Sequence, residues 1–148
     1  PDVLAALAAE LRYVWTLAVA FDQTAGSRPV GRFRVGWVPV AVFARGDPRV
    51  PGPVGDLYTV RPTPAGAKPL HPWQQPADPV RYWVSRLAPA GGLVADPWAG
   101  AGTVGVVCRS VGLRYVGTER DRATWAAACG RLRGDPAGGR PGADAPTP

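Results

Sequence analysis

The sequence has 148 residues, and 46% of them are hydrophobic, a share that excludes a wholly disordered chain. Its 19 glycines and 18 prolines predict long loops or an unstructured tail. No apolar run approaches the roughly 20 residues of a membrane-spanning helix, and no signal-peptide pattern is present, so we expect a cytoplasmic protein. The net charge of +6 fits a polyanionic partner, although GC-rich coding explains the arginine content equally well.

The first half of the chain predicts a helix, two extended segments and a loop. Leucines at near-helical spacing predict a helix over residues 2–14, and the apolar run 15–21 predicts a buried strand. Residues 32–45 predict a second extended segment. Because proline cannot donate to a ladder, Pro39 indicates an edge strand, a bulge or a strand that begins only after it. Residues 46–70 are so rich in proline and glycine that we expect a loop without regular structure.

The second half predicts alternating helices and strands. Asp78 and Pro79 are placed to open a helix in which Trp83 faces the core, and Asp121 is placed to cap another in which Trp125 is also a core residue. Between these two helices we expect a strand over 93–96, a tight loop over 97–102, a helix over 103–111 and a strand over 114–119. Strand–helix–strand–helix is the unit of a parallel α/β sheet, whereas residues 134–148 cannot bury a core and predict a disordered tail.

A glycine-rich loop lies between the first of these strands and its helix. Residues 100–105 match the pattern G-x-G-x-x-G, in which glycines permit a sharp turn and close approach of a ligand to the backbone. Glu119 ends the next strand, where an acid accepts hydrogen bonds from ribose hydroxyls. A dinucleotide or S-adenosylmethionine fits this pattern. Asp96 and Trp98 favour the second, because a carboxylate repels a pyrophosphate but suits a cationic ligand.

Three motifs resemble those of one enzyme family. Residues 96–103, Asp-Pro-Trp-Ala-Gly-Ala-Gly-Thr, resemble the D-P-F-x-G-x-G-T cofactor motif of DNA amino-methyltransferases, which methylate adenine N6 or cytosine N4. Residues 71–76, His-Pro-Trp-Gln-Gln-Pro, resemble the H-P-x-Q-K-P element that precedes it, and residues 116–121 are similar to the G-x-E-x-D ending of the second strand. Gln75 replaces the usual lysine and Trp98 the usual phenylalanine. The resemblance covers about residues 10–130.

The resemblance implies an incomplete Rossmann-like methyltransferase fold in a permuted order, with the catalytic half first. We expect one domain over residues 1–133, made of the helix and strand pair of 2–45, the loop of 46–70 and the cofactor-binding unit of 71–133. The family's catalytic tetrapeptide, Asp/Asn/Ser-Pro-Pro-aromatic, is absent from the 148 residues. We therefore expect it upstream of Pro1, no catalytic residue in this chain, and no methyl transfer by the chain alone.

The resemblance also implies the site residues and partners. Glu119 would hold the ribose of S-adenosylmethionine, and we expect no metal site. The partner would be double-stranded DNA, and the protein would belong to a bacterial or phage restriction-modification setting. A nicotinamide- or flavin-dependent oxidoreductase fragment and a non-catalytic DNA-binding remnant are the alternatives. The predicted cofactor-binding residues are Asp96, Pro97, Trp98, Gly100, Gly102, Thr103, Glu119, His71, Trp73 and Gln74.

Overall fold

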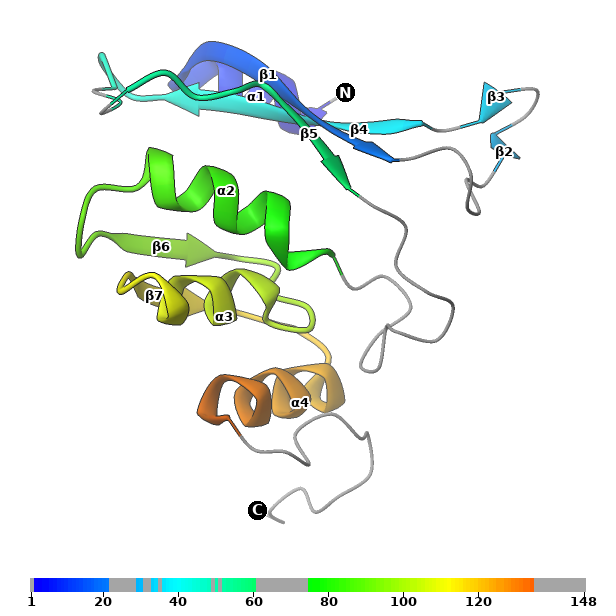
Figure 1. Cartoon of the computed structure of the whole chain (residues 1–148), viewed down its shortest axis with the longest axis vertical. Helices are drawn as coiled ribbons and strands as arrows, with labels where there is room; N and C mark the ends of the chain where they lie inside the picture. Colours follow the sequence, from blue (N-terminus) through cyan, green and yellow to red (C-terminus); the bar gives the residue numbers. More distant parts are fainter. Residues whose placement is uncertain are drawn as a thin grey trace. The chain divides into compact units, whose positions relative to one another are not determined.

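The chain divides into two compact units, Pro1–Pro62 and Thr63–Pro148. The first contains mainly strands, and the second alternates helices with strands (Figure 1). No helix in the described ranges has the length and apolar character needed to cross a membrane. The computed structural model describes residues 2–21, 29–30, 33–34, 36–48, 50, 52–60 and 75–134.

The first unit begins with a helix that is shorter than the sequence predicts. Helix α1 (Asp2–Glu10) stops short of the predicted end at residue 14, because the chain from Arg12 onward pairs as a strand with β4 (Trp37–Ala44). The first pair is Arg12 opposite Ala44. This long-range pairing overrides the local leucine spacing. The elements of this unit are α1 (Asp2–Glu10), β1 (Arg12–Phe21), β2 (Pro29–Val30), β3 (Phe33–Arg34), β4 (Trp37–Ala44) and β5 (Leu57–Val60).

Strands β4, β1 and β5 form one sheet in that order. Strand β1 pairs antiparallel with β4 and parallel with β5. Pro39 of β4 lies opposite Ala18 of β1. Among the described residues β4 is an edge strand, where the missing N–H group of proline is tolerated. The prediction that residues 46–70 hold no regular structure is wrong at β5. Its four β-compatible residues pair with Ala18–Phe21, a partner that the surrounding prolines and glycines do not reveal.

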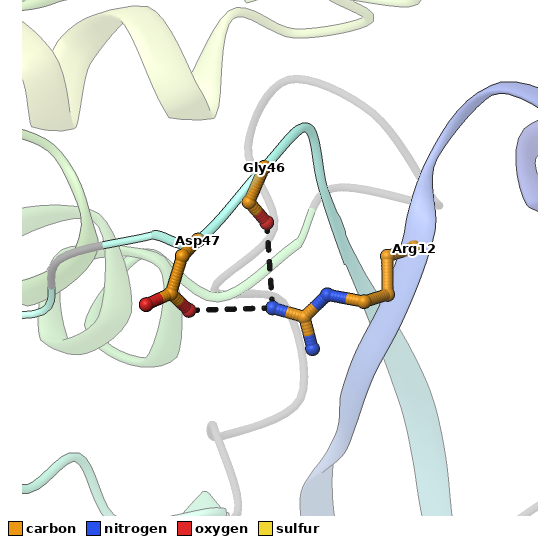
Figure 2. Close-up of polar contacts among 3 residues, drawn as sticks. All are labelled: Arg12, Gly46 and Asp47. Atoms are coloured by element: carbon orange, nitrogen blue, oxygen red, sulfur yellow. Dashed lines mark hydrogen bonds and ion pairs between the residues drawn. The ribbon is translucent and has the colours of Figure 1, made fainter.

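Two side chains of β1, Arg12 and Trp15, form hydrogen bonds with the segments after β4 and before β5. The Arg12 side chain donates to the Gly46 carbonyl oxygen at 3.3 Å and to Asp47 Oδ1 at 3.5 Å. Figure 2 shows these three residues and the two contacts. Both charged side chains are largely exposed, so their ion pair contributes about 0–1 kcal/mol. Trp15 Nε1 donates to Asp56 Oδ2 at 3.1 Å.

The second unit confirms the predicted strand–helix–strand–helix order. Its two strands pair in parallel, with Asp96 opposite Gly117 at their carboxyl ends. Parallel neighbours require a crossover connection, which helix α3 supplies here. The elements are α2 (Ala77–Leu87), β6 (Leu93–Asp96), α3 (Thr103–Ser110), β7 (Arg114–Gly117) and α4 (Arg122–Arg133).

Helix α3 is the centre of this unit, because it packs against α2, β7 and α4 (Figure 1). Val107 and Cys108 of this helix are fully buried, and Trp83 of α2 is only 6% exposed, which confirms it as a core residue. Trp125 is 49% exposed, so its prediction as a core residue is wrong. Trp125 and Ala128 are spaced as neighbours on one helix face, but of these two only the small Ala128 side chain is buried.

The two helix starts that the sequence predicts differ in the structure. Asp121 caps α4, with its Oδ1 accepting from the Thr124 backbone N–H at 2.8 Å. Asp78 does not cap α2. That helix begins two residues earlier than predicted, at Ala77, with Pro76 as its N-cap and without a side-chain cap hydrogen bond, so Asp78 lies in the first turn instead.

Candidate functional site

The loop between β6 and α3 forms a tight turn held against the end of β7. Ala99 N–H donates to the Thr118 carbonyl oxygen at 2.8 Å, and Gly102 N–H donates to the Ala99 carbonyl oxygen at 2.8 Å. Gly100 and Gly102 have φ values of +52° and +72°, in the left-handed region that residues with a Cβ atom rarely adopt. The first turn of α3 follows directly, and the first turn of a helix has N–H groups without partners inside the helix.

Glu119 connects this loop to the end of β7. Its Oε2 accepts from the Gly100 N–H at 3.0 Å, and its Oε1 accepts from the Asp121 N–H at 2.9 Å. Hydrogen bonds from backbone amides, that of Asp121 foremost, hold the pKa of Glu119 below its ordinary value of 4.5. The carboxylate is therefore ionised at neutral pH, and it lies at the glycine loop although 19 positions separate Glu119 from Gly100.

Asp96 ends β6 with both carboxylate oxygens in hydrogen bonds. Oδ1 accepts from the Trp98 N–H at 3.2 Å, and Oδ2 accepts from the Tyr115 hydroxyl at 3.3 Å. Burial and then the charge of Asp96 raise the pKa of Tyr115 to about 12, so the phenol keeps its proton and donates a hydrogen bond to the carboxylate. A carboxylate oxygen has two lone pairs, so these contacts leave Asp96 acceptor capacity for a ligand.

Trp98 is the most exposed large side chain of the loop. It is 83% exposed, although an indole ring is large and mostly apolar. The preceding residue is fixed, because the Pro97 carbonyl oxygen accepts from the Thr118 hydroxyl at 2.8 Å. The backbone next to Trp98 is therefore fixed by a hydrogen bond, and the exposed indole ring is available for contact with a ligand.

Thr103 and Arg131 form a hydrogen bond where the loop becomes α3. Thr103 is only 6% exposed, and its Oγ1 accepts from Arg131 Nη1 at 3.2 Å. The same nitrogen donates to the Ala101 carbonyl oxygen at 2.8 Å. Arg131 could not be predicted from the sequence. It lies 28 positions after Thr103 on a helix that contains other arginines, and no local pattern distinguishes it.

The structure thus brings seven of the ten predicted site residues into one region. Three others, His71, Trp73 and Gln74, lie outside the described residues and stay predictions, as do the ligand contacts of the whole set. Within the described ranges, no group of three or more histidine, cysteine or acidic residues is placed to hold a metal ion. The residues found together around the loop are Asp96, Pro97, Trp98, Gly100, Thr103 and Glu119, with Gly102 at the start of α3.

Comparison with protein families identifies the chain. The sequence profile of the DNA methylase family matches residues 14–128, more than half of the chain. The chain belongs to the DNA methylase family. The matched range includes the glycine loop, Glu119 and strands of both units, so the assignment to the DNA methylase family does not depend on the glycine motif alone.

Solved structures share the fold of this methylase chain at low sequence identity. The crystal structure of M1.HpyAVI in complex with SAM is 20% identical over 88% of this chain, with a TM-score of 0.66. The cytosine-N4-specific PvuII DNA methyltransferase is 17% identical over 88% of this chain, with a TM-score of 0.70. The chain spans 66% and 55% of the lengths of these two proteins. No curated protein sequence matches the chain.

Proposed function

We propose that this chain is the S-adenosylmethionine-binding portion of a DNA amino-methyltransferase, which transfers a methyl group to the exocyclic amino group of adenine or cytosine. One observation carries the proposal: the Glu119 carboxylate reaches the Gly100 N–H, so that an ionised acid and a glycine loop form one site. Membership of the DNA methylase family supports the reaction class. The solved SAM complex that shares the fold supports the cofactor.

The residues present fit this cofactor. Glu119 is ionised and fixed, so it can accept hydrogen bonds from the ribose hydroxyls. The negative charge of Asp96 suits the cationic methionyl part, and the exposed Trp98 ring can pack on the ligand. A Cβ atom on Gly100 would meet only the Trp98 carbonyl oxygen, at 4.0 Å, so the backbone there is open to close approach. We also assign Pro97, Gly102 and Thr103 to the loop that surrounds the cofactor, and His71, Trp73 and Gln74 to its methionine end.

The chemistry divides between this chain and residues outside it. The bound cofactor supplies an electrophilic methyl group on a sulfonium, and the residues of this chain hold and orient it. The acceptor is a base swung out of double-stranded DNA, whose amino group must be aligned with the methyl carbon. The tetrapeptide that orients this amino group in the family is absent from the 148 residues, so the permuted arrangement with an upstream catalytic half remains part of the proposal.

The proposal includes the organisation and setting of the protein. Both units would belong to one methyltransferase domain over residues 1–133, which is supported by a family profile that spans both units. The predicted tail of residues 134–148 lies outside the described residues from residue 135 onward and stays a prediction. The net charge of +6 is compatible with a polyanionic partner such as DNA. We infer that the protein is a cytoplasmic restriction-modification enzyme that is encoded by a bacterium or a phage.

Calorimetry with two ligands tests the proposed cofactor. We expect the chain to bind S-adenosylmethionine and not NAD, and we expect Glu119→Gln to weaken this binding about 10- to 100-fold, because it removes a charged hydrogen-bond acceptor. Glu10→Gln, the same change at an exposed acid of α1, is the matched control and should leave the affinity unchanged.

Each other outcome of this calorimetry has a defined meaning. Binding of NAD without S-adenosylmethionine would favour the oxidoreductase alternative and contradict the proposal. Binding of neither ligand, or an affinity for S-adenosylmethionine that Glu119→Gln does not change, would favour a non-catalytic DNA-binding remnant. Each of these three outcomes would show that the proposed cofactor site is wrong.

A further inference from the structure

Arg131 connects α4 to the end of the glycine loop. Its Nη1 donates to the Ala101 carbonyl oxygen at 2.8 Å and to Thr103 Oγ1 at 3.2 Å, and both contacts are partly buried. These acceptors belong to the last turn of the loop and the first residue of α3. A single side chain therefore fixes the junction where the loop becomes a helix.

The Ala101–Gly102 peptide is held at both of its polar ends. Arg131 binds its carbonyl oxygen, and its N–H donates to the Ala99 carbonyl oxygen at 2.8 Å. With both groups bound, rotation of this peptide plane would break two hydrogen bonds. This peptide ends at Gly102 and follows Gly100 by one residue, and both glycines have the positive φ values that define the turn, so its orientation determines the shape of the loop.

The same face of α4 also contacts the loop through Ala128. A Cβ atom on Gly102 would lie 3.1 Å from the Ala128 Cβ atom, so the backbone of the loop and the helix are in close contact there. Ala128 and Arg131 are three positions apart and share one helix face. Packing and hydrogen bonding from α4 thus act on neighbouring atoms of the loop.

The guanidinium of Arg131 is held by neutral oxygens. Within the described ranges no carboxylate forms an ion pair with it, and burial lowers the pKa of Arg131. This environment differs from that of Arg12, whose ion pair with Asp47 is exposed. Partial burial of a charge without a counterion is unfavourable unless hydrogen bonds offset it, and here the two loop acceptors do so.

We propose that Arg131 is a positioning residue for the cofactor loop, which it holds in the shape that binds S-adenosylmethionine by fixing the Ala101 carbonyl and the Thr103 hydroxyl. The inference rests on the proposed function of the loop. It assigns Arg131 no contact with the cofactor. The expected effect of losing it is a change in cofactor affinity and in the environment of the loop amides, with the chain still folded.

The test measures S-adenosylmethionine affinity by calorimetry and the amide resonances of residues 99–103 by NMR. Arg131→Ala should weaken binding about 10-fold, because charged hydrogen bonds that hold the loop are lost, and it should shift these resonances in the free protein. Arg131→Lys keeps one charged donor, so its affinity should lie between those of Arg131→Ala and the parent chain. Arg133→Ala, at an exposed arginine two positions further on, is the matched control and should change neither readout.

The outcomes separate this inference from the proposed function. If the parent chain does not bind S-adenosylmethionine, the proposed function itself fails. If the parent binds and Arg131→Ala binds equally well, or if Arg131→Lys binds no better than Arg131→Ala, Arg131 is not a positioning residue. If Arg131→Ala does not fold, Arg131→Lys alone decides: several-fold weaker binding with shifted loop resonances supports the inference, and parental affinity with unshifted resonances overturns it.

Discussion

At Glu119, charge and geometry are set by the backbone around it. The amides of Gly100 and Asp121 donate to separate oxygens of the carboxylate, which fixes the plane of the group and keeps the pKa of Glu119 low. Each oxygen retains a second lone pair, so these two bonds leave room for ribose hydroxyls. The acid is thus held in place before a ligand arrives, which reduces the entropy that binding costs.

The lowered pKa of Glu119 predicts how stability depends on pH. Because the pKa is lower in the folded chain than its ordinary value of 4.5, the ionised form stabilises the fold above that value, and this contribution is lost as the pH falls through the folded-state pKa. We expect the parent chain to be more stable than Glu119→Gln at neutral pH, with a difference that shrinks below about pH 4.5. Urea unfolding of both chains across this range checks it. A difference that stays constant with pH would contradict the hydrogen bonds assigned to Glu119.

At the scale of elements, α4 depends on its cap and α2 does not. Asp121→Ala removes the hydrogen bonds to the Thr124 N–H and hydroxyl groups and should lower the free energy of unfolding by about 1 kcal/mol. Asp78→Ala at the start of α2 is the matched control. It removes no cap hydrogen bond and should cost only a few tenths of a kcal/mol through the helix dipole. Equal losses in thermal or urea unfolding would show that the two helix starts do not differ as the structure indicates.

Close packing of α3 on β7 depends on Gly105. A Cβ atom there would lie 2.7 Å from Tyr115 Cε1 and 2.9 Å from Leu132 Cδ2, so Gly105→Ala should destabilise the chain by about 1–3 kcal/mol. Inside a helix the same change ordinarily stabilises by about 0.5–1 kcal/mol, so the sign of the effect is diagnostic. In a Tyr115→Val background, urea unfolding should show a smaller cost, because one of the colliding groups is gone. A stabilising Gly105→Ala would mean that α3 and β7 are further apart.

Local signals in the sequence predicted the second unit better than the first. The elements around residues 93–133 follow from helical periodicity, glycines at turns and short apolar runs, all of which act over a few residues. The end of α1 and the strand β5 could not be predicted in this way, because each is decided by pairing with a strand far along the chain. Within the site, Asp96 and Glu119 have a sequence signal at strand ends. Arg131 has none, since only the packing of α4 brings it to the loop.

At the scale of the whole molecule, the 148 residues contain the proposed cofactor site and no Asp/Asn/Ser-Pro-Pro-aromatic tetrapeptide. We expect the 148-residue chain to transfer no methyl group to DNA, and a longer chain that carries an upstream Pro-Pro-aromatic tetrapeptide to do so. Incubation of both with radiolabelled S-adenosylmethionine and duplex DNA measures the difference. Turnover by the short chain would show that the amino group of the base can be oriented by other residues.

The most direct measurement is an experimental structure of this chain with S-adenosylmethionine bound. We predict that the ribose hydroxyls lie within hydrogen-bond distance of the Glu119 carboxylate, that the Trp98 ring packs on the ligand, and that the backbone of Gly100 is in contact with it. A ligand held by other parts of the chain, or a Glu119 side chain directed away from the sugar, would contradict the site.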